Sequence, residues 1–333
     1  MPPPPAPVTV LIPNFNGRDL LPDAIRSALA QDLPPAEVLV IDDASTDDSP
    51  SFAPTLGARV VTQSANRGFA STVNLGVGAC ATEWIAIVNS DVVLGAGWLS
   101  GLLQAATDAG ADYACGPLLN AAHPHLLDGG YDLLSLGGCP WRAGNGFPAA
   151  ALRPPPAAWL PPLTALLIRR TAFLAAGRLD ERFGSYLEDV DFALRCLKLG
   201  LRGVFVPKAT ATHRGSATFG TWSPRATRLL SRNQLLLVAR HYPSGWPARS
   251  ARALLAAQLL WGGVACRHGQ LLPWLYGKFE ALRLWPRFRA QSDPFPLEAF
   301  RTHCEAWEHE IRAWQGKPPR DVYWRWYFRL AGS

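Results

Sequence analysis

Short apolar runs alternate with segments of helical spacing along the first third of the chain. The runs span residues 8–12, 37–41, 59–62 and 84–88. Apolar residues recur with helical spacing at 20–29, and further helices are expected at 69–80 and 97–109. Ser45 and Asp48 have the spacing of a capping box that begins another helix. Strands alternating with helices predict an α/β fold, with a mostly parallel sheet covered by helices on both faces.

The later part of the chain departs from this alternation. Residues 128–162 are rich in glycine and proline, which predicts a long loop, and such loops are commonly functional or mobile. Regular elements resume at residues 163–168, 188–199 and 203–206. Beyond Pro224 nearly every segment has helical spacing. We therefore expect an α/β domain over residues 1–220 and a helical region over residues 221–333.

Charge and tryptophan are distributed unevenly. Residues 1–221 hold 15 Lys and Arg against 19 Asp and Glu. Residues 222–333 hold 17 against 7, with nine of the 13 tryptophans. A basic, Trp-rich helical region without a long apolar run is typical of an element that lies on a membrane surface. An ordinary solvated surface is the alternative, and we expect no nucleic acid partner.

The six cysteines lie far apart, at positions 80, 115, 139, 196, 266 and 304. This dispersal excludes a zinc knuckle and a CxxC redox motif, and it is typical of reduced thiols in a cytosolic protein. The N-terminal sequence has no secretory signal pattern. We expect a cytoplasmic protein, peripheral on the inner face of the cytoplasmic membrane.

Polar residues follow each of the first four predicted strands, at the edge where open parallel sheets bind their ligands. In strand order they are Pro13 and Asn14, then Asp42 and Asp43, then Arg67, then Asn89, Ser90 and Asp91. No G-x-G-x-x-G and no G-x-x-x-x-G-K-[ST] occurs, so a dinucleotide fingerprint and a P-loop are unsupported. Carboxylates in these places can bind a base, a ribose or a Mg²⁺ or Mn²⁺ ion, while turn formation and helix capping explain them equally.

Three carboxylates begin the helix predicted at 188–199, in the sequence LEDVD. Acids there are stabilised by the helix dipole, although one or two suffice for capping. Asp189 faces away from the i, i+3 pair Glu188 and Asp191. That orientation suits a general base that points into a cleft.

Two further groups are candidates for binding. His213 closes a predicted strand; a lone histidine is commonly structural, but its imidazole would complete a metal site if it met Asp91. Arg225, Arg228 and Arg232 lie on one face of a predicted helix. They can hold phosphates of a donor or of a lipid-linked acceptor, and an exposed basic face explains them equally well.

The order of these segments is more specific than any one of them. In sequence, the chain carries VTVLIPNFNGRDLLPDAIRSAL, VLVIDDASTDDS, NRGFASTVNLGV, WIAIVNSDVVL, RLDERFGSYLEDVDFALRCLKLG and ATATHRGSA. Over residues 8 to about 240 it resembles glycosyltransferase family 2, particularly the rhamnosyltransferase-like bacterial branch. The resemblance implies a GT-A fold, which is a Rossmann-like sheet with a nucleotide half at about 8–115 and an acceptor half at about 116–220.

The same resemblance implies a reaction and assigns roles. The reaction is inverting transfer of a sugar, rhamnose being the first candidate, from a UDP-, dTDP- or GDP-sugar to a glycan or lipid-linked acceptor. Asp42, with Asp43 beside it, matches the acid that contacts the base or ribose. Arg67 matches the basic residue of that pocket, and Asp189 matches the catalytic base of the family's E-D motif.

The metal motif departs from the family pattern. Asp91 matches the last acid of the D-x-D motif, which here is Asn89-Ser90-Asp91 with a single carboxylate. His213 matches a histidine that completes the metal site in some members. The resemblance thus implies Mg²⁺ or Mn²⁺ held largely by the donor phosphates. Two alternatives stay open, a non-catalytic nucleotide-sugar-binding protein and a membrane-surface scaffold.

Overall fold

The computed structural model describes residues 5–215, 222–245, 248–318 and 320–332. These described residues form two compact units. The first takes in residues 5–131, 144–154 and 161–215, and the second takes in residues 132–143, 155–160 and the described part of 222–332. The boundary predicted near residue 220 lies outside the described residues.

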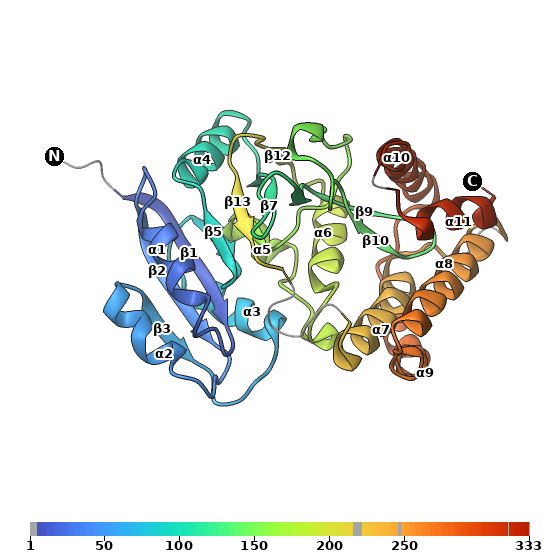
Figure 1. The fold of residues 1–333 in the computed structure, drawn as a ribbon, viewed down its shortest axis with the longest axis horizontal. Coiled ribbons are helices and arrows are strands. Elements are labelled where there is room, and N and C mark those ends of the chain that lie inside the picture. Colours follow the sequence, from blue (N-terminus) through green and yellow to red (C-terminus); the bar gives the residue numbers. More distant parts are fainter. Residues whose placement is uncertain (1–4, 216–221, 246–247, 319, 333) are drawn as a thin grey trace. The chain divides into compact units, whose positions relative to one another are not determined.

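A seven-stranded sheet forms the centre of the first unit, in the order β12-β6-β11-β4-β1-β2-β3. Figure 1 shows β1, β2 and β3 side by side at one edge of it. The strands are β1 (Ala6–Asn14), β2 (Pro35–Asp42), β3 (Arg59–Thr62), β4 (Trp84–Val88), β6 (Tyr113–Cys115), β11 (Ala165–Arg169) and β12 (Gly203–Phe205). Neighbouring strands pair in parallel, except that β11 runs antiparallel to both β4 and β6. The predicted α/β fold with a mostly parallel sheet is confirmed.

The strands of this sheet carry apolar side chains on both of its faces, and helices therefore cover both faces. They are α1 (Leu21–Leu29), α2 (Ser49–Phe52), α3 (Phe69–Ala79), α4 (Trp98–Asp108), α5 (Arg170–Ala175) and α6 (Glu188–Lys198), with 3₁₀ turns η1 (Ala53–Leu56), η2 (Ala149–Ala151) and η3 (Glu181–Phe183). Val10 and Ile12 of β1 belong to the buried core that includes residues of α1 and α4. Leu11 faces α3 instead, where a Cβ added to Gly76 would lie 2.3 Å from Leu11 Cδ1. That glycine lets α3 approach the sheet closely.

A second sheet of four short strands lies in the same unit, in the order β5-β13-β7-β8. The strands are β5 (Val92–Leu94), β7 (Leu118–Asn120), β8 (Leu127–Gly129) and β13 (Ala211–His213). His213 is in register with Val92 on one side and with Asn120 on the other. This sheet therefore brings together segments that are far apart in the sequence.

Two sequence-based expectations about local structure were wrong. The stretch predicted as a loop contains the end of β8 and an antiparallel pair, β9 (Asp132–Leu134) and β10 (Pro140–Arg142), because three-residue strands are too short to show a period of two. The capping box is also absent. The helix begins later, at Ser49, and the Ser45 hydroxyl instead donates to Asp42 Oδ1 at 2.5 Å and accepts from the Asn16 amide at 2.8 Å.

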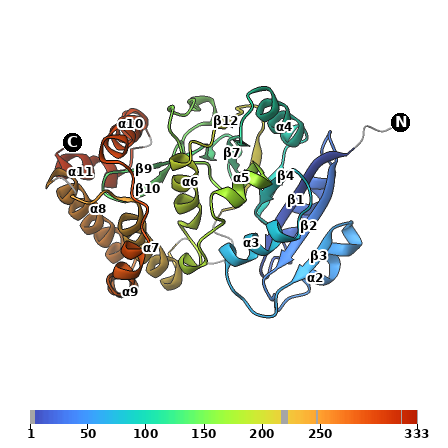
Figure 2. The same cartoon turned by 180° about the vertical axis from the view of Figure 1, so that it is seen from behind.

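The second unit is helical apart from β9 and β10, as predicted for the C-terminal region (Figure 2). Its helices are α7 (Pro224–His241), α8 (Ala248–Arg267), α9 (Leu271–Ala290), α10 (Leu297–Gln315) and α11 (Val322–Ala331). The Trp141 ring of β10 lies 6.2 Å from the Trp314 ring and 6.3 Å from the Trp324 ring, edge to face. Among the described residues, no helix has the length and apolar composition needed to cross a bilayer.

Candidate active site

His213 lies between two carboxylates. Its Nε2 is 3.3 Å from Asp91 Oδ2, and its Nδ1 is 2.8 Å from Asp128 Oδ2. Burial by itself lowers the pKa of this ring, but the hydrogen bonds and charges of Asp128 and Asp91 outweigh burial and raise the pKa of His213 to about 9. The four-stranded sheet brings the three side chains together, because Asp91 precedes β5, His213 ends β13 and Asp128 lies within β8.

The sequence predicted that His213 would complete a metal site only if it met Asp91, and in the structure the two side chains do meet. Asp128 was missed, since it lies in the segment predicted as a loop and no motif marks it. With a pKa of about 9 the ring carries a proton on both nitrogens near neutral pH, so Nδ1–H donates to Asp128 and Nε2–H faces Asp91. A cation at Nε2 would have to replace that proton, and the Asp128 carboxylate would then keep the ring oriented. Among the described residues, no group of three or more His, Cys, Asp or Glu surrounds one metal position. Asp91 and His213 meet without a third such side chain on the same point of space among these residues.

A buried polar cluster joins the ends of β1 and β2. Asp42 is completely buried, and its Oδ1 accepts hydrogen bonds from Asn14 Nδ2 at 2.9 Å and from the Ser45 hydroxyl. Asn14 Nδ2 also reaches Ser49 Oγ at 2.9 Å. Pro13, just before Asn14, is buried in β1. These bonds hold together the two turns at the carboxyl edge of the sheet, where the predicted nucleotide residues lie.

Asp43 shapes the turn that precedes α3. Its Oδ1 accepts from the Arg67 amide at 2.7 Å and from Gln63 Nε2 at 2.8 Å, and its Oδ2 accepts from the Gly68 amide at 2.8 Å. Gly68 has a φ of +87°, and a Cβ there would lie 2.8 Å from the Gly184 carbonyl oxygen. Asp43 thus positions the Arg67 backbone, while the Arg67 side chain is exposed to solvent.

Two buried amide oxygens at this edge have no hydrogen-bond partner within the described chain: Asn14 Oδ1 and Asn89 Oδ1. Asn89 and Ser90 are half-buried between the end of β4 and Asp91. Buried acceptors without partners are uncommon in native proteins and call for an explanation, such as a ligand or water. Both belong to the residues predicted to bind the nucleotide sugar.

The carboxylate pair Glu188-Asp189 follows a strained corner. Tyr186 and Leu187 have φ values of +69° and +66°, a left-handed conformation that non-glycine residues rarely adopt and that clusters at functional sites. Glu188 is buried, whereas Asp189 is half-buried with its Oδ1 accepting from the Val190 amide at 2.8 Å. The pair is thus split between the interior and the surface.

Asp191, the third acid of this turn, is fully buried. Its Oδ2 accepts from Arg195 Nη2 at 2.8 Å, one turn along α6. The differing exposure of Asp189 and its two acidic neighbours agrees with the spacing argument, which placed Glu188 and Asp191 on one face. Among these three acids, Asp189 is the one that solvent reaches most readily.

Two family models match the chain: "Glycosyl transferase family 2" over residues 9–124 and "Glycosyl transferase family group 2" over residues 84–285. The second match covers more than half of the chain. The chain belongs to glycosyltransferase family 2. The predicted family is therefore confirmed, and with it the general activity of sugar transfer.

Curated relatives of this chain include a rhamnosyltransferase. The N-acetylglucosaminyl-diphospho-decaprenol L-rhamnosyltransferase of Mycobacterium tuberculosis is 30% identical over 244 residues, which cover 64% of this chain and 77% of that protein. The succinoglycan biosynthesis protein ExoO of Rhizobium meliloti is 36% identical over 110 residues, which cover 32% of each. The resemblance to rhamnosyltransferase-like members is thereby confirmed.

Solved structures share the fold of this glycosyltransferase at low identity. GalNAc-T7 with UDP, GalNAc and Mn²⁺ aligns with a TM-score of 0.60 and 15% identity, over 95% of this chain and 59% of that one. The mannosyltransferase PcManGT from Pyrobaculum calidifontis, in complex with GDP-Man and Mn²⁺, aligns with a TM-score of 0.51 and 16% identity, over 99% and 88%. This chain thus spans less than two thirds of the first structure's length. The likenesses confirm the predicted GT-A fold.

The three predicted arginines of this glycosyltransferase lie on α7, in the second unit. Arg228 pairs with Glu280 of α9, with Nη2 at 2.6 Å from Oε1. Arg232 Nε donates to Asn233 Oδ1 at 2.8 Å, and Arg225 is exposed. Asp91, His213 and Asp189 belong to the first unit, so the arginines are not part of the same compact body.

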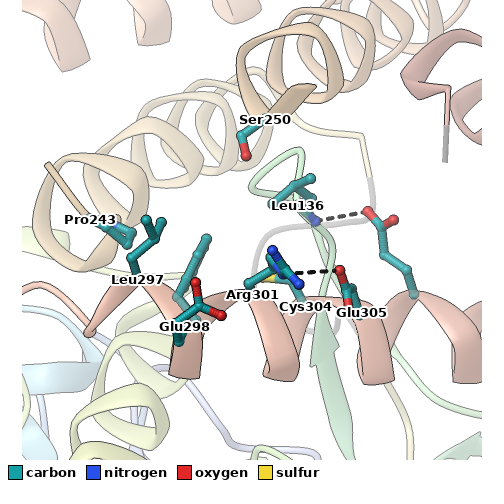
Figure 3. A pocket seen from close by; sticks show the side chains of 10 residues that line it. Leu136, Pro243, Ser250, Leu297, Glu298, Arg301, Cys304 and Glu305 are labelled. Atoms are coloured by element: carbon teal, nitrogen blue, oxygen red, sulfur yellow. Dashed lines mark hydrogen bonds and ion pairs between the residues drawn. The ribbon is translucent and has the colours of Figure 1, made fainter. Parts of the chain in front are cut away.

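A cavity of about 390 Å³ lies within the second unit (Figure 3). In its wall the Leu136 amide donates to Glu308 Oε1 at 3.0 Å, and Arg301 pairs with Glu305 at 3.5 Å. Cys304 lines it as well. None of the residues predicted to bind donor, metal or acceptor lines this cavity, so it adds nothing to the candidate active site.

The buried Glu188 makes the stability of the enzyme depend on pH. Burial, followed by the charge of Asp189, raises the pKa of Glu188 well above its usual value. A raised folded-state pKa contributes stability that is complete below the ordinary glutamate pKa of about 4.3 and is lost as pH rises through the raised value. We therefore expect Glu188→Gln to increase the free energy of unfolding relative to wild type more at pH 8 than at pH 5, measured by urea denaturation. Glu298→Gln, an exposed control, should show no such pH dependence, and parallel pH profiles for wild type and Glu188→Gln would contradict the expectation.

Proposed function

We propose that this glycosyltransferase moves a sugar from a nucleoside-diphosphate donor to an acceptor hydroxyl with inversion at the anomeric carbon, in the synthesis of a cell-surface polysaccharide or glycolipid. The observation that carries the proposal is the 3.3 Å approach of His213 Nε2 to Asp91 Oδ2, at the carboxyl edge of the sheet. The named L-rhamnosyltransferase supports rhamnose as the sugar and a lipid-diphosphate-linked sugar as the acceptor.

Asp91 and His213 would hold the divalent cation, Mg²⁺ or Mn²⁺. The Asp91 carboxylate suits either ion, and the donor phosphates and water would fill most of the remaining positions. The His213 imidazole suits Mn²⁺ better than Mg²⁺, which prefers oxygen ligands. Held by these two residues, a cation would supply Lewis-acid chemistry, which would neutralise the charge that develops on the departing nucleoside diphosphate. Two structural neighbours, GalNAc-T7 and PcManGT, contain Mn²⁺ in their solved structures, and this supports the same kind of site here.

The remaining roles fall on groups at the same edge of the first unit. Asp42 and Asn14 keep the two turns in place for the base and ribose, and the exposed Arg67 side chain contacts the base or a phosphate. Asp189 takes the proton from the acceptor hydroxyl as that oxygen attacks the anomeric carbon. Its neighbour Glu188 is buried, and burial raises the pKa of that carboxyl well above its usual value, so the two carboxyl groups differ in acidity and in access to solvent.

Asp128 is expected to act as a positioning residue for His213. Asp128→Asn should weaken Mn²⁺ binding about 10–100-fold, because a neutral amide holds the imidazole tautomer less firmly than a carboxylate does. Calorimetric titration of Mn²⁺ in the presence of nucleoside diphosphate measures the change. Asp108→Asn, at an exposed position of α4, is the matched control, and equal Mn²⁺ affinity in all three proteins would rule out this role.

A donor screen tests the proposed function. The purified protein is incubated with UDP-, dTDP- and GDP-sugars, with Mn²⁺ or Mg²⁺, and release of nucleoside diphosphate is measured with and without a prenyl-diphosphate-linked sugar acceptor. Release from one donor that requires both acceptor and metal, and that stops in EDTA, is the expected result. Calorimetric binding of a donor without release under any of these conditions would instead favour a non-catalytic nucleotide-sugar-binding protein.

A further inference from the structure

The outward face of α9 is apolar along its length. Leu272, Phe279 and Leu282 are 77%, 56% and 64% exposed, and Leu275 and Pro286 are exposed between and after them. These five residues fall at i, i+3, i+7, i+10 and i+14, so they form one stripe on the 20-residue helix. We call them the α9 stripe.

The opposite face of α9 packs against α7 through small residues. Gly277 and Ala281 are buried, and a Cβ at Gly277 would lie 2.3 Å from the Arg228 carbonyl oxygen of α7. A surface helix of a soluble protein ordinarily buries its large apolar side chains and exposes polar ones. In α9 the large leucines and the phenylalanine of the stripe face outward. Both views place α9 at the margin of its own unit (Figure 1, Figure 2).

Positive charge borders the stripe. Arg283 and Arg287 are exposed beside it, and the Arg283 guanidinium lies 5.8 Å from the centre of the Phe279 ring. The helix carries one acid, Glu280, which pairs with Arg228 of α7. An apolar stripe with cationic flanks is complementary to a surface that offers hydrocarbon beneath a layer of negative charge. A second copy would instead bring like charges together along a two-fold contact.

Two other helices of the second unit also expose apolar side chains. On α8, Leu255 and Leu259 are exposed one turn apart, with Arg252 also exposed. On α11, Trp326 and Leu330 are exposed at the same spacing. Exposed apolar groups that recur on adjoining helices of one unit indicate an interaction surface more strongly than scattered single residues do.

We propose that the α9 stripe docks this protein on an anionic phospholipid surface. The helix axis lies along the membrane plane, the stripe enters the boundary between headgroups and acyl chains, and Arg283 and Arg287 contact lipid phosphates. This surface belongs to the second unit and is independent of the donor chemistry, although it would bring the enzyme to a lipid-linked acceptor.

Vesicle flotation with the full chain tests the proposal. Vesicles that contain phosphatidylglycerol should carry the wild-type protein, less so at high salt, and pure phosphatidylcholine vesicles should carry little. Leu272→Ser with Phe279→Ser should weaken binding about tenfold or more, because two exposed apolar anchors are lost. Leu199→Ser, which changes a leucine 55% exposed at the end of α6 in the first unit, is the matched control and should bind as wild type does.

A charge variant separates the two parts of the surface. Arg283→Gln and Arg287→Gln should each weaken binding to the anionic vesicles about fivefold, with little effect on phosphatidylcholine. Circular dichroism and melting curves check that each variant is folded. The proposal is overturned if the wild type does not float with anionic vesicles. It is equally overturned if the serine double variant binds them as wild type does, and conversion of a wild-type dimer to a monomer in that variant would assign the stripe to a second copy.

Discussion

Asp189→Asn is expected to reduce sugar transfer about 10²–10⁴-fold, the usual contribution of a general base. Asparagine has nearly the same shape as aspartate, and its Oδ1 can still accept the hydrogen bond that the Val190 amide donates at 2.8 Å. The first turn of α6 should therefore form as before. The amide, however, cannot take a proton from the acceptor hydroxyl. Initial rates of nucleoside diphosphate release, with acceptor present, measure the effect.

Two further measurements make this result specific. Donor binding by Asp189→Asn should be close to that of wild type, since the loss is expected in turnover and not in affinity. Asp108→Asn, which alters an exposed acid of the same unit, should leave turnover unchanged. Wild-type turnover in Asp189→Asn would show that Asp189 is not the general base, even if the donor screen had identified a substrate.

Asp91→Ala is expected to weaken metal-dependent donor binding by about 100-fold or more, because loss of a direct ligand should cost at least as much as loss of an outer-shell partner. The binding is measured by calorimetric titration of the donor in Mn²⁺ and in EDTA. In EDTA the variant and the wild type should bind the donor equally weakly. Asp91→Asn, which keeps the side-chain shape beside His213, should show the same loss if the cation is the reason.

His213→Ala and the double variant complete this test. If Asp91 and His213 hold one ion, the two single changes should not add in the double variant, because either change already removes the shared site. Additive losses would mean that the residues act separately. Donor affinity that is unchanged in Asp91→Ala, both with Mn²⁺ and with EDTA, would refute a metal role for Asp91.

The elements of the main sheet and their helices could be predicted from the sequence. Apolar residues recur with a period of two in a half-buried strand and of 3.6 in an amphipathic helix, while a fully buried strand is a short continuous apolar run. Segments such as 37–41 and 69–80 are long enough to show which pattern applies. The same reasoning located Asp91 at a strand end and Asp189 in a helical first turn. These positions depend on neighbours in the chain, which a sequence pattern can report.

Local sequence patterns gave wrong predictions where a side chain bonds to residues other than the neighbours that the pattern implies. Ser45 has the spacing of a capping residue, yet its hydroxyl bonds Asp42 and the Asn16 amide, because burial of Asp42 makes an extra donor more valuable there than at an exposed helix end. The strand that carries Asp128 has three residues, too few to display a period of two. The partner of His213 Nδ1 was therefore invisible.

The sequence alone determined the family, the α/β order of the first unit, the helical C-terminal region and its excess of positive charge. Only the tertiary structure decided which carboxylates meet His213, which member of the Glu188-Asp189 pair is buried, and which side of α9 faces outward. Periodicity records that a helix has two unlike faces, but it does not say which face a neighbour covers. The close approach of α7 at Gly277 settles that for α9, because a large side chain does not fit there and the leucines must lie on the other side.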